Sequence, residues 1–192
     1  GVRGIALVGA AAEALLMGYA FPRIIGTSAG AMVGSLVAAG FRAGELATGV
    51  RQVPWAELAD PVAGSRVPVI GPHAGVLTGG SLYRGDRIEE VWTELLERKG
   101  VRTFGDLPEG SLRIVATDIT HQRGVVFPDD LEAYDLDPAA FPVARAVRIS
   151  SAVPFVFRPV ELESPETGHA SLLVDGALAS NFALRLVDAE DP

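Results

Sequence analysis

The chain has 192 residues, which is enough for one domain that buries a substantial core. Its 16 basic and 24 acidic side chains give a formal net charge of −8, which argues against a nucleic-acid-binding protein because such proteins carry a basic surface. The chain is 48% hydrophobic and 21% charged and has no cysteine, so a disordered chain, disulfides, thiolate catalysis and cysteine-bound metals are excluded.

The first predicted elements are a helix, a strand and a second helix. Residues 5–17 are rich in alanine and leucine and are followed by a glycine, which is typical of a capped helix. The apolar pair Ile24-Ile25 lies between a proline and a glycine and predicts a short buried strand. Residues 29–39 predict a second helix, whose small side chains allow close packing on a sheet. This order of elements favours an α/β architecture.

The chain changes character in its middle third. Residues 43–59 predict one or two short helices. Residues 60–82 mix glycine and proline with valine, isoleucine and leucine, and predict an irregular apolar insertion that is either functional or a plain surface excursion. Residues 86–99 carry apolar side chains at helical spacing and predict a scaffold helix without chemistry.

The last part of the chain predicts short strands around one helix. The helix is expected at residues 138–147, where Pro142 can interrupt it. Strands are expected at residues 112–119, 124–127, 155–160 and 171–174. No segment reaches ~18 uninterrupted apolar residues, so no membrane span is predicted. A single α/β domain is the simplest account of these elements.

A candidate nucleophile lies between the first predicted strand and the second helix. Gly26-Thr27-Ser28-Ala29-Gly30 matches the pattern G-x-S-x-G. A sharp turn from strand to helix exposes such a serine, and it needs small neighbours because the chain passes closely there. The serine oxygen would then lie at the positive end of the helix, and the N–H of Ala29 can contribute to an oxyanion hole. The context therefore favours a nucleophilic Ser28 over a structural turn.

A histidine is the usual base for a nucleophilic serine. The chain has three, His73, His121 and His169. His169, with Asp118 or Asp135 as the acid, would satisfy the order serine, acid, histidine that α/β-hydrolases show. None of the three carries a further signature, so each is also compatible with an exposed loop residue.

An aspartate is the alternative base. Asp175 follows the apolar run 172–174 and precedes the small residues Gly176 and Ala177. Open α/β sheets place their chemistry at the carboxyl ends of strands, so Asp175 could take the proton of Ser28 directly. Asp118 also ends a predicted strand, but we interpret it as a structural hydrogen-bond acceptor.

Taken together, these segments resemble the patatin-like phospholipase family. That family carries a glycine-rich motif ending in R-G, then G-x-S-x-G, then D-G-G or D-G-A. Gly1-Val2-Arg3-Gly4 resembles the end of the first motif, Gly26–Gly30 matches the second, and Asp175–Ala177 matches the third. Further blocks in the family's order occur at residues 79–85, 103–108, 115–118 and 150–155.

The resemblance implies a three-layer α/β/α sandwich with a mainly parallel central sheet. It implies a catalytic dyad of Ser28 as nucleophile and Asp175 as base, an oxyanion hole that includes Gly1 and Ala29, and no metal or cofactor. The implied reaction is hydrolysis of carboxylic esters of lipids, with a transient membrane contact and a cytoplasmic or membrane-peripheral location. The oligomeric state stays open. Residues 1–192 would be one domain, truncated at both ends, with its insertion at about 60–82.

Two other functions remain open at this point. One is an esterase of the α/β-hydrolase type with a Ser-His-Asp triad. The other is a non-catalytic lipid-binding or scaffold module that keeps the same fold. The first glycines of the opening motif lie outside this chain, which bears on the oxyanion hole.

Overall fold

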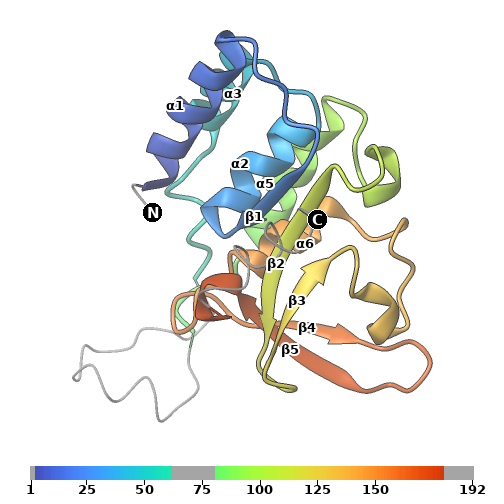
Figure 1. The fold of residues 1–192 in the computed structure, drawn as a ribbon. Coiled ribbons are helices and arrows are strands. Elements are labelled where there is room, and N and C mark those ends of the chain that lie inside the picture. The colour runs from blue at the N-terminus through green and yellow to red at the C-terminus, as the bar shows by residue number, and fades with distance from the viewer. Residues whose placement is uncertain (1–2, 62–80, 180–192) are drawn as a thin grey trace.

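The computed structural model describes residues 3–61 and 81–179 (Figure 1). The helices are α1 (Arg3–Leu16), α2 (Ala29–Ala38), α3 (Ala43–Gln52), α5 (Asp86–Glu97) and α6 (Val143–Ser150). The strands are β1 (Ile24–Thr27), β2 (Leu112–Asp118), β3 (Arg123–Phe127), β4 (Val160–Glu163) and β5 (Ala170–Asp175). Short 3-10 helices occur at η1 (Phe104–Asp106), η2 (Leu131–Tyr134) and η3 (Gly176–Ala179). No helix in these two ranges is long and apolar enough to cross a membrane.

Strand β2 is the centre of the sheet. Its residues 114–118 pair antiparallel with β3 along one edge. Along the other edge, residues 112–115 pair with β1 in parallel, and residues 116–118 pair with β5 antiparallel. Because each strand has two edges, β1 and β5 share one edge of β2, and their carboxyl ends meet there. Strand β4 pairs with the outer edge of β5.

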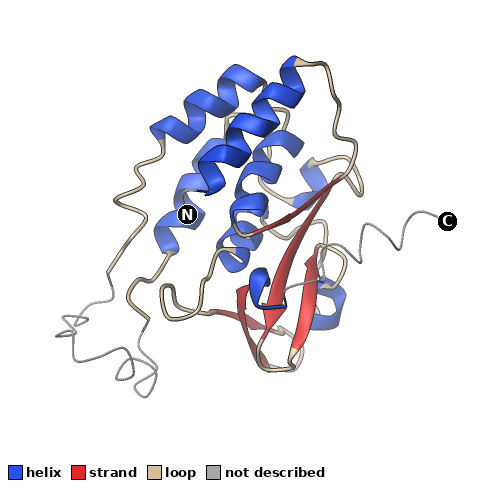
Figure 2. Cartoon of the chain, turned by 60° about the vertical axis from the view of Figure 1, so that its left-hand side comes forward, coloured by secondary structure: helices blue, strands red, loops and turns tan. Residues whose placement is uncertain are grey.

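The helices gather on one side of this sheet (Figure 2). The small residues of α2 let it approach β1 closely, since a Cβ on Gly34 would lie 2.8 Å from Ile24 Cγ2. Helix α5 buries the apolar face that the sequence predicts, and Trp92 Nε1 donates to the Met32 carbonyl of α2 at 3.1 Å. This packing fixes the start of α2 against the end of β1, which positions the candidate site.

The α/β class is confirmed, but the sheet differs from the expected one. Of the four strand pairings in the described ranges, only β1 with β2 is parallel. The short hairpins at residues 119–122 and 164–169 leave no room for a crossover, so they enforce antiparallel neighbours. The helices form one of the two expected outer layers (Figure 2), and the short helix η3 contacts β2 and β3.

Two predicted elements need correction. Helix α6 begins after Pro142, which is its N-cap, because proline fits a helix start but not a helix interior. Residues 155–159 do not form a strand; the strand β4 begins only at Val160. Phe155 has a positive φ of 68°, which breaks an extended conformation. Most of the predicted insertion lies outside the described residues.

Candidate active site

Ser28 occupies a sharp turn between β1 and α2. Its backbone has φ 54° and ψ −122°, a combination that costs a non-glycine residue on the order of 1–3 kcal/mol. Gly26 makes the turn feasible, because a Cβ there would lie 2.6 Å from the Gly30 carbonyl oxygen. Strain of this kind persists where the surroundings enforce it, and it is concentrated at functional sites. The G-x-S-x-G pattern thus forms the predicted strand-turn-helix.

The hydroxyl of Ser28 is not used to hold the turn. The Ser28 carbonyl accepts the first helical hydrogen bond of α2 from Met32 N–H at 3.1 Å. The Ser28 N–H donates to the hydroxyl of Ser150 at 2.9 Å. The Ser28 side chain makes no capping hydrogen bond and is partly exposed. Its oxygen can therefore react with a substrate without releasing a structural contact.

Asp175 lies where β5 meets β1 end to end. Thr27 pairs with Val115, and Asp175 pairs with Ala116, the next residue of the same β2 edge. Neighbouring pairing positions on a strand are about 3.3 Å apart, so the residues that end β1 and β5 are adjacent in space. Ser28 directly follows the first of these strand ends. The two residues singled out from opposite ends of the sequence therefore come to one junction.

The turn after Asp175 requires glycine. A Cβ on Gly176 would lie 2.4 Å from the Val115 carbonyl oxygen and 2.9 Å from Thr27 Cγ2. The Asp175 side chain is 3% exposed, and its Oδ1 accepts the Ala177 N–H at 2.9 Å. The glycine of the D-G-A motif thus has a steric reason, because the chain leaves the sheet at the point where β1 ends.

The start of α2 offers backbone donors for a negatively charged oxygen, because the N–H groups before Met32 have no acceptor within the helix. The N–H of Ser28 is taken by Ser150, so the N–H of Ala29 is the first one available after the serine. Gly4 in α1 is close by, since a Cβ on it would lie 3.2 Å from Ala29 Cβ. Arg3 begins α1, and Gly1 lies outside the described residues.

His121 and Asp118 form a separate cluster at the far end of β2. Asp118 is fully buried and accepts hydrogen bonds from the N–H groups of Thr120 and His121 and from the Tyr134 hydroxyl, as expected of a structural acceptor. His121 Nδ1 lies 2.8 Å from Asp118 Oδ2 and 3.3 Å from Ser171 Oγ. Ser171 precedes Asp175 by four residues on β5, about 14 Å along the strand.

Burial and hydrogen bonding set the titration of this cluster. Burial of Asp118 disfavours its charge, but hydrogen bonds from His121 and Tyr134 outweigh that effect and hold the pKa of Asp118 below its usual value. Burial, with the hydrogen bond to Asp118, raises the pKa of Tyr134 to about 12. The cluster therefore keeps an ionised carboxylate and a neutral phenol at neutral pH.

His169 also lies away from Ser28. It is exposed and immediately precedes β5, six residues and about 20 Å of strand from Asp175. Asp135, a candidate acid for it, instead accepts a hydrogen bond from the Ser164 hydroxyl. His73 falls outside the described residues. Neither described histidine thus supplies a base near Ser28.

Exposed apolar residues occur in two segments that meet at Asp175. The Asp175 N–H donates to the Ala152 carbonyl at 3.0 Å, which places these two residues side by side. Val153 is 41% exposed, Phe155 63%, and Leu178, three residues after Asp175, 59%. Exposure of apolar side chains of this size to water is unfavourable, so these residues suit contact with an apolar partner.

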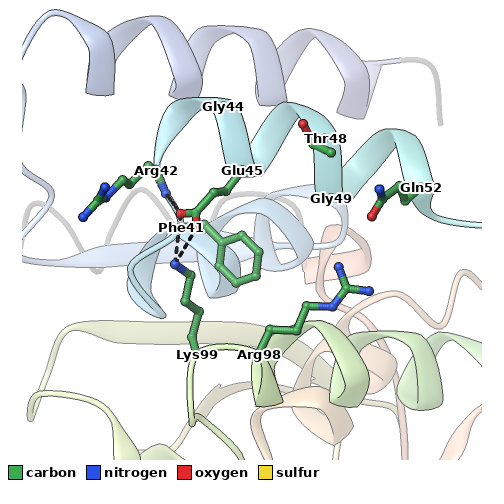
Figure 3. Close-up of a pocket in the computed structure, with 9 residues that line it drawn as sticks. All are labelled: Phe41, Arg42, Gly44, Glu45, Thr48, Gly49, Gln52, Arg98 and Lys99. Carbon is green, nitrogen blue, oxygen red and sulfur yellow. Dashed lines mark hydrogen bonds and ion pairs between the residues drawn. The ribbon is translucent and has the colours of Figure 1, made fainter.

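A pocket of about 710 Å³ lies apart from this junction, between α3 and the end of α5 (Figure 3). Within it, Lys99 Nζ lies 2.9 Å from the Glu45 carboxylate and 5.2 Å from the centre of the Phe41 ring. Its lining contains no serine, histidine or aspartate. The pocket therefore offers no counterpart to the chemistry at Ser28.

Ser150 and Phe155 were not assigned a role from the sequence. Both lie in the block at residues 150–155, which resembles a block of the family but indicates no catalytic role for its residues. The contact of Ser150 with Ser28 spans 122 positions of the chain. No local pattern signals such a contact.

Comparisons with known proteins show the family and the fold of this chain. The sequence model of the family described as "Patatin-like phospholipase" matches residues 1–188. The uncharacterized protein YqhO of Bacillus subtilis (strain 168) is 40% identical over 190 residues, which cover 99% of this chain and 65% of YqhO. VipD from Legionella pneumophila has a similar structure, with a TM-score of 0.58 at 17% identity over 93% of this chain and 44% of VipD. At that identity, the similarity to VipD concerns the fold alone.

Proposed function

This chain belongs to the patatin-like phospholipase family, and on that premise we propose that it is a serine lipid acyl hydrolase with Ser28 as nucleophile and Asp175 as base. Family membership supports lipid acyl hydrolysis in general. The particular observation that carries the residue assignment is the meeting of β1 and β5 on one edge of β2. This meeting supports the pairing of a strained serine, whose side chain makes no capping hydrogen bond, with a buried aspartate.

The proposed reaction follows from the chemistry of these two side chains. Asp175 accepts the proton of Ser28 as the serine oxygen attacks the ester carbonyl carbon. The negative charge that develops on the carbonyl oxygen is stabilised by the N–H of Ala29 and by the backbone near Gly1. Asp175 then protonates the leaving alcohol. In the second half, Asp175 activates water, which releases the acid and restores Ser28.

The exposed apolar residues support a substrate with long acyl chains. Val153, Phe155 and Leu178 are exposed and apolar, and each lies within three residues of Asp175 or of its backbone partner Ala152. Because the chain carries a net charge of −8, attraction to anionic lipid contributes little to such a contact. We therefore propose a transient, mainly apolar contact with a neutral or zwitterionic lipid surface around the site.

Labelling with a fluorophosphonate probe tests the proposal directly. The full-length protein should be labelled at Ser28, and Ser28→Ala should abolish both labelling and hydrolysis of a p-nitrophenyl acyl ester, a loss of about 10⁴-fold or more. Ser171→Ala is the matched control, because Ser171 lies beside a histidine and yet should keep full labelling. Absence of labelling in the unmodified protein would favour a non-catalytic module. Loss of labelling in Ser171→Ala alone would favour a histidine-dependent site.

A further inference from the structure

The end of α6 contacts both halves of the candidate site. The Ser150 hydroxyl accepts a hydrogen bond from the Ser28 N–H at 2.9 Å and donates one to the Val115 carbonyl at 2.7 Å. Two residues further on, the Ala152 carbonyl accepts the N–H of Asp175 at 3.0 Å. A segment of three residues is therefore hydrogen-bonded to the nucleophile turn, to the central strand and to the aspartate.

The hydroxyl of Ser150 bridges two backbone groups where the pairing of β1 with β2 ends. The pairing of β1 with β2 ends at Thr27 and Val115, because the chain turns away at Ser28. A hydroxyl can accept one hydrogen bond while donating another, so it can join the Ser28 N–H to the Val115 carbonyl across this gap. Ser150 is fully buried, so water cannot readily replace it there.

This contact acts on the strained part of the turn. A residue at φ 54° and ψ −122° keeps that conformation only if its surroundings restrain it. Ser150 restrains the N–H of Ser28, and the Ser28 carbonyl is restrained from the other side by Met32 of α2. Small displacements of a reacting group reduce rates strongly, so a restraint at this atom matters for chemistry more than for folding.

We infer that Ser150 is a positioning residue, whose hydroxyl fixes the backbone of Ser28. Because Ala152 in the same segment accepts the Asp175 N–H, this contact also fixes the placement of Ser28 relative to Asp175. The catalytic part of this inference rests on the proposed function. The hydroxyl of Ser150 is hydrogen-bonded to the backbone of Ser28 and of Val115 and not to a reacting side chain. Its removal should therefore lower the rate of the chemical step and leave substrate binding nearly unchanged.

The test compares Ser150→Ala with Ser35→Ala. Ser35 is also fully buried and also loses a hydroxyl hydrogen bond, to the Met32 carbonyl, but it does not contact the Ser28 turn. We expect Ser150→Ala to lower kcat by about 100-fold with KM within about twofold, and Ser35→Ala to leave both unchanged. Hydrogen exchange measured by mass spectrometry on the peptide that covers Ser28 should quicken about tenfold in Ser150→Ala only.

The pair Ser150→Thr and Ser150→Val keeps the test decisive if Ser150→Ala does not fold. Both add the same bulk, and only threonine retains the hydroxyl. Higher kcat and slower exchange at Ser28 in Ser150→Thr than in Ser150→Val support the inference, and equal values overturn it.

The exchange measurement separates this inference from the proposed function. If the unmodified protein hydrolyses no ester but Ser150→Ala still quickens exchange at Ser28, the proposed function fails and the backbone restraint stands. If the protein is active and Ser150→Ala leaves kcat and exchange unchanged, the positioning role is wrong. A fall in kcat with unchanged exchange also contradicts it, because the rate would then be lost by another route.

Discussion

Two clusters in the described part of the chain, each with a serine and an aspartate, lie toward opposite ends of β5. One joins Ser28 and Asp175 where β1 and β5 meet. The other joins Ser171, His121 and Asp118, which are the three residue types of a classical hydrolase triad. By residue type alone, the second cluster has the stronger claim to catalysis, because it contains a histidine.

Geometry reverses that ranking. A triad uses both nitrogens of the imidazole, one toward the acid and one toward the serine. Here Asp118 and Ser171 both approach Nδ1 of His121, so the nitrogen that would have to take the serine proton is the one already paired with the acid. Ser171 lies in a regular strand and is buried, whereas Ser28 has a strained backbone and a partly exposed hydroxyl. Backbone conformation and access, rather than residue type, distinguish the two clusters.

Asp175→Asn should produce the larger effect of the two aspartate substitutions, and it should affect activity. Asparagine keeps an oxygen for the Ala177 N–H, so the fold should be retained, but it cannot accept the proton of Ser28. Loss of a general base reduces kcat by about 10²–10⁴-fold. Hydrolysis of a p-nitrophenyl acyl ester, with unfolding followed by circular dichroism, measures both quantities. Full activity in Asp175→Asn would refute the dyad and return attention to the histidines.

Asp118→Asn should show the opposite pattern, with a loss of stability and little change in kcat. The substitution removes the buried carboxylate with which the Tyr134 hydroxyl and the His121 ring are paired, which costs about 1–3 kcal/mol of unfolding free energy. Urea denaturation at neutral pH measures this loss. If Asp118→Asn keeps its stability and loses its turnover, catalysis belongs to the cluster of Asp118 and not to Ser28 and Asp175.

The pH dependence of stability sharpens the role of Asp118. Its pKa is lower in the folded than in the unfolded protein, so its stabilising effect is complete above the unfolded value of about 3.9 and is lost as the pH falls through the folded value. Asp118→Asn should therefore flatten the fall of stability in acid below about pH 4. An unchanged acid limb in the variant would contradict this assignment.

Local patterns predicted the parts of the site that short sequences determine. Ser28 with its glycines and Asp175 with Gly176 were found because sharp turns demand small residues at fixed spacing. The shared edge of β2 could not be predicted, because register depends on which distant strands pair. The contact of Ser150 with Ser28 had no signal either, since a single serine at a helix end resembles many structural ones.

The errors at residues 138–160 have the same origin. An apolar run with aromatic residues predicted a strand at 155–160, but Phe155 has a positive φ and an exposed side chain. Propensity describes the preference of a segment in isolation, and here the tertiary contacts of the site override it. The sequence thus indicated candidate residues, while the arrangement between them required the structure.

The smallest effect is expected when His73, His121 and His169 are changed to glutamine together. His121 is paired with Asp118 and Ser171, and His169 precedes β5 at the end opposite Asp175, so kcat should stay within about twofold. Stability should fall by no more than about 1 kcal/mol, because the His121 side chain that pairs with Asp118 is 58% exposed. Ester hydrolysis by the triple variant measures the first value and urea denaturation the second. A loss of activity comparable to that of Ser28→Ala would mean that a histidine acts as the base, and the three single substitutions would then identify which one.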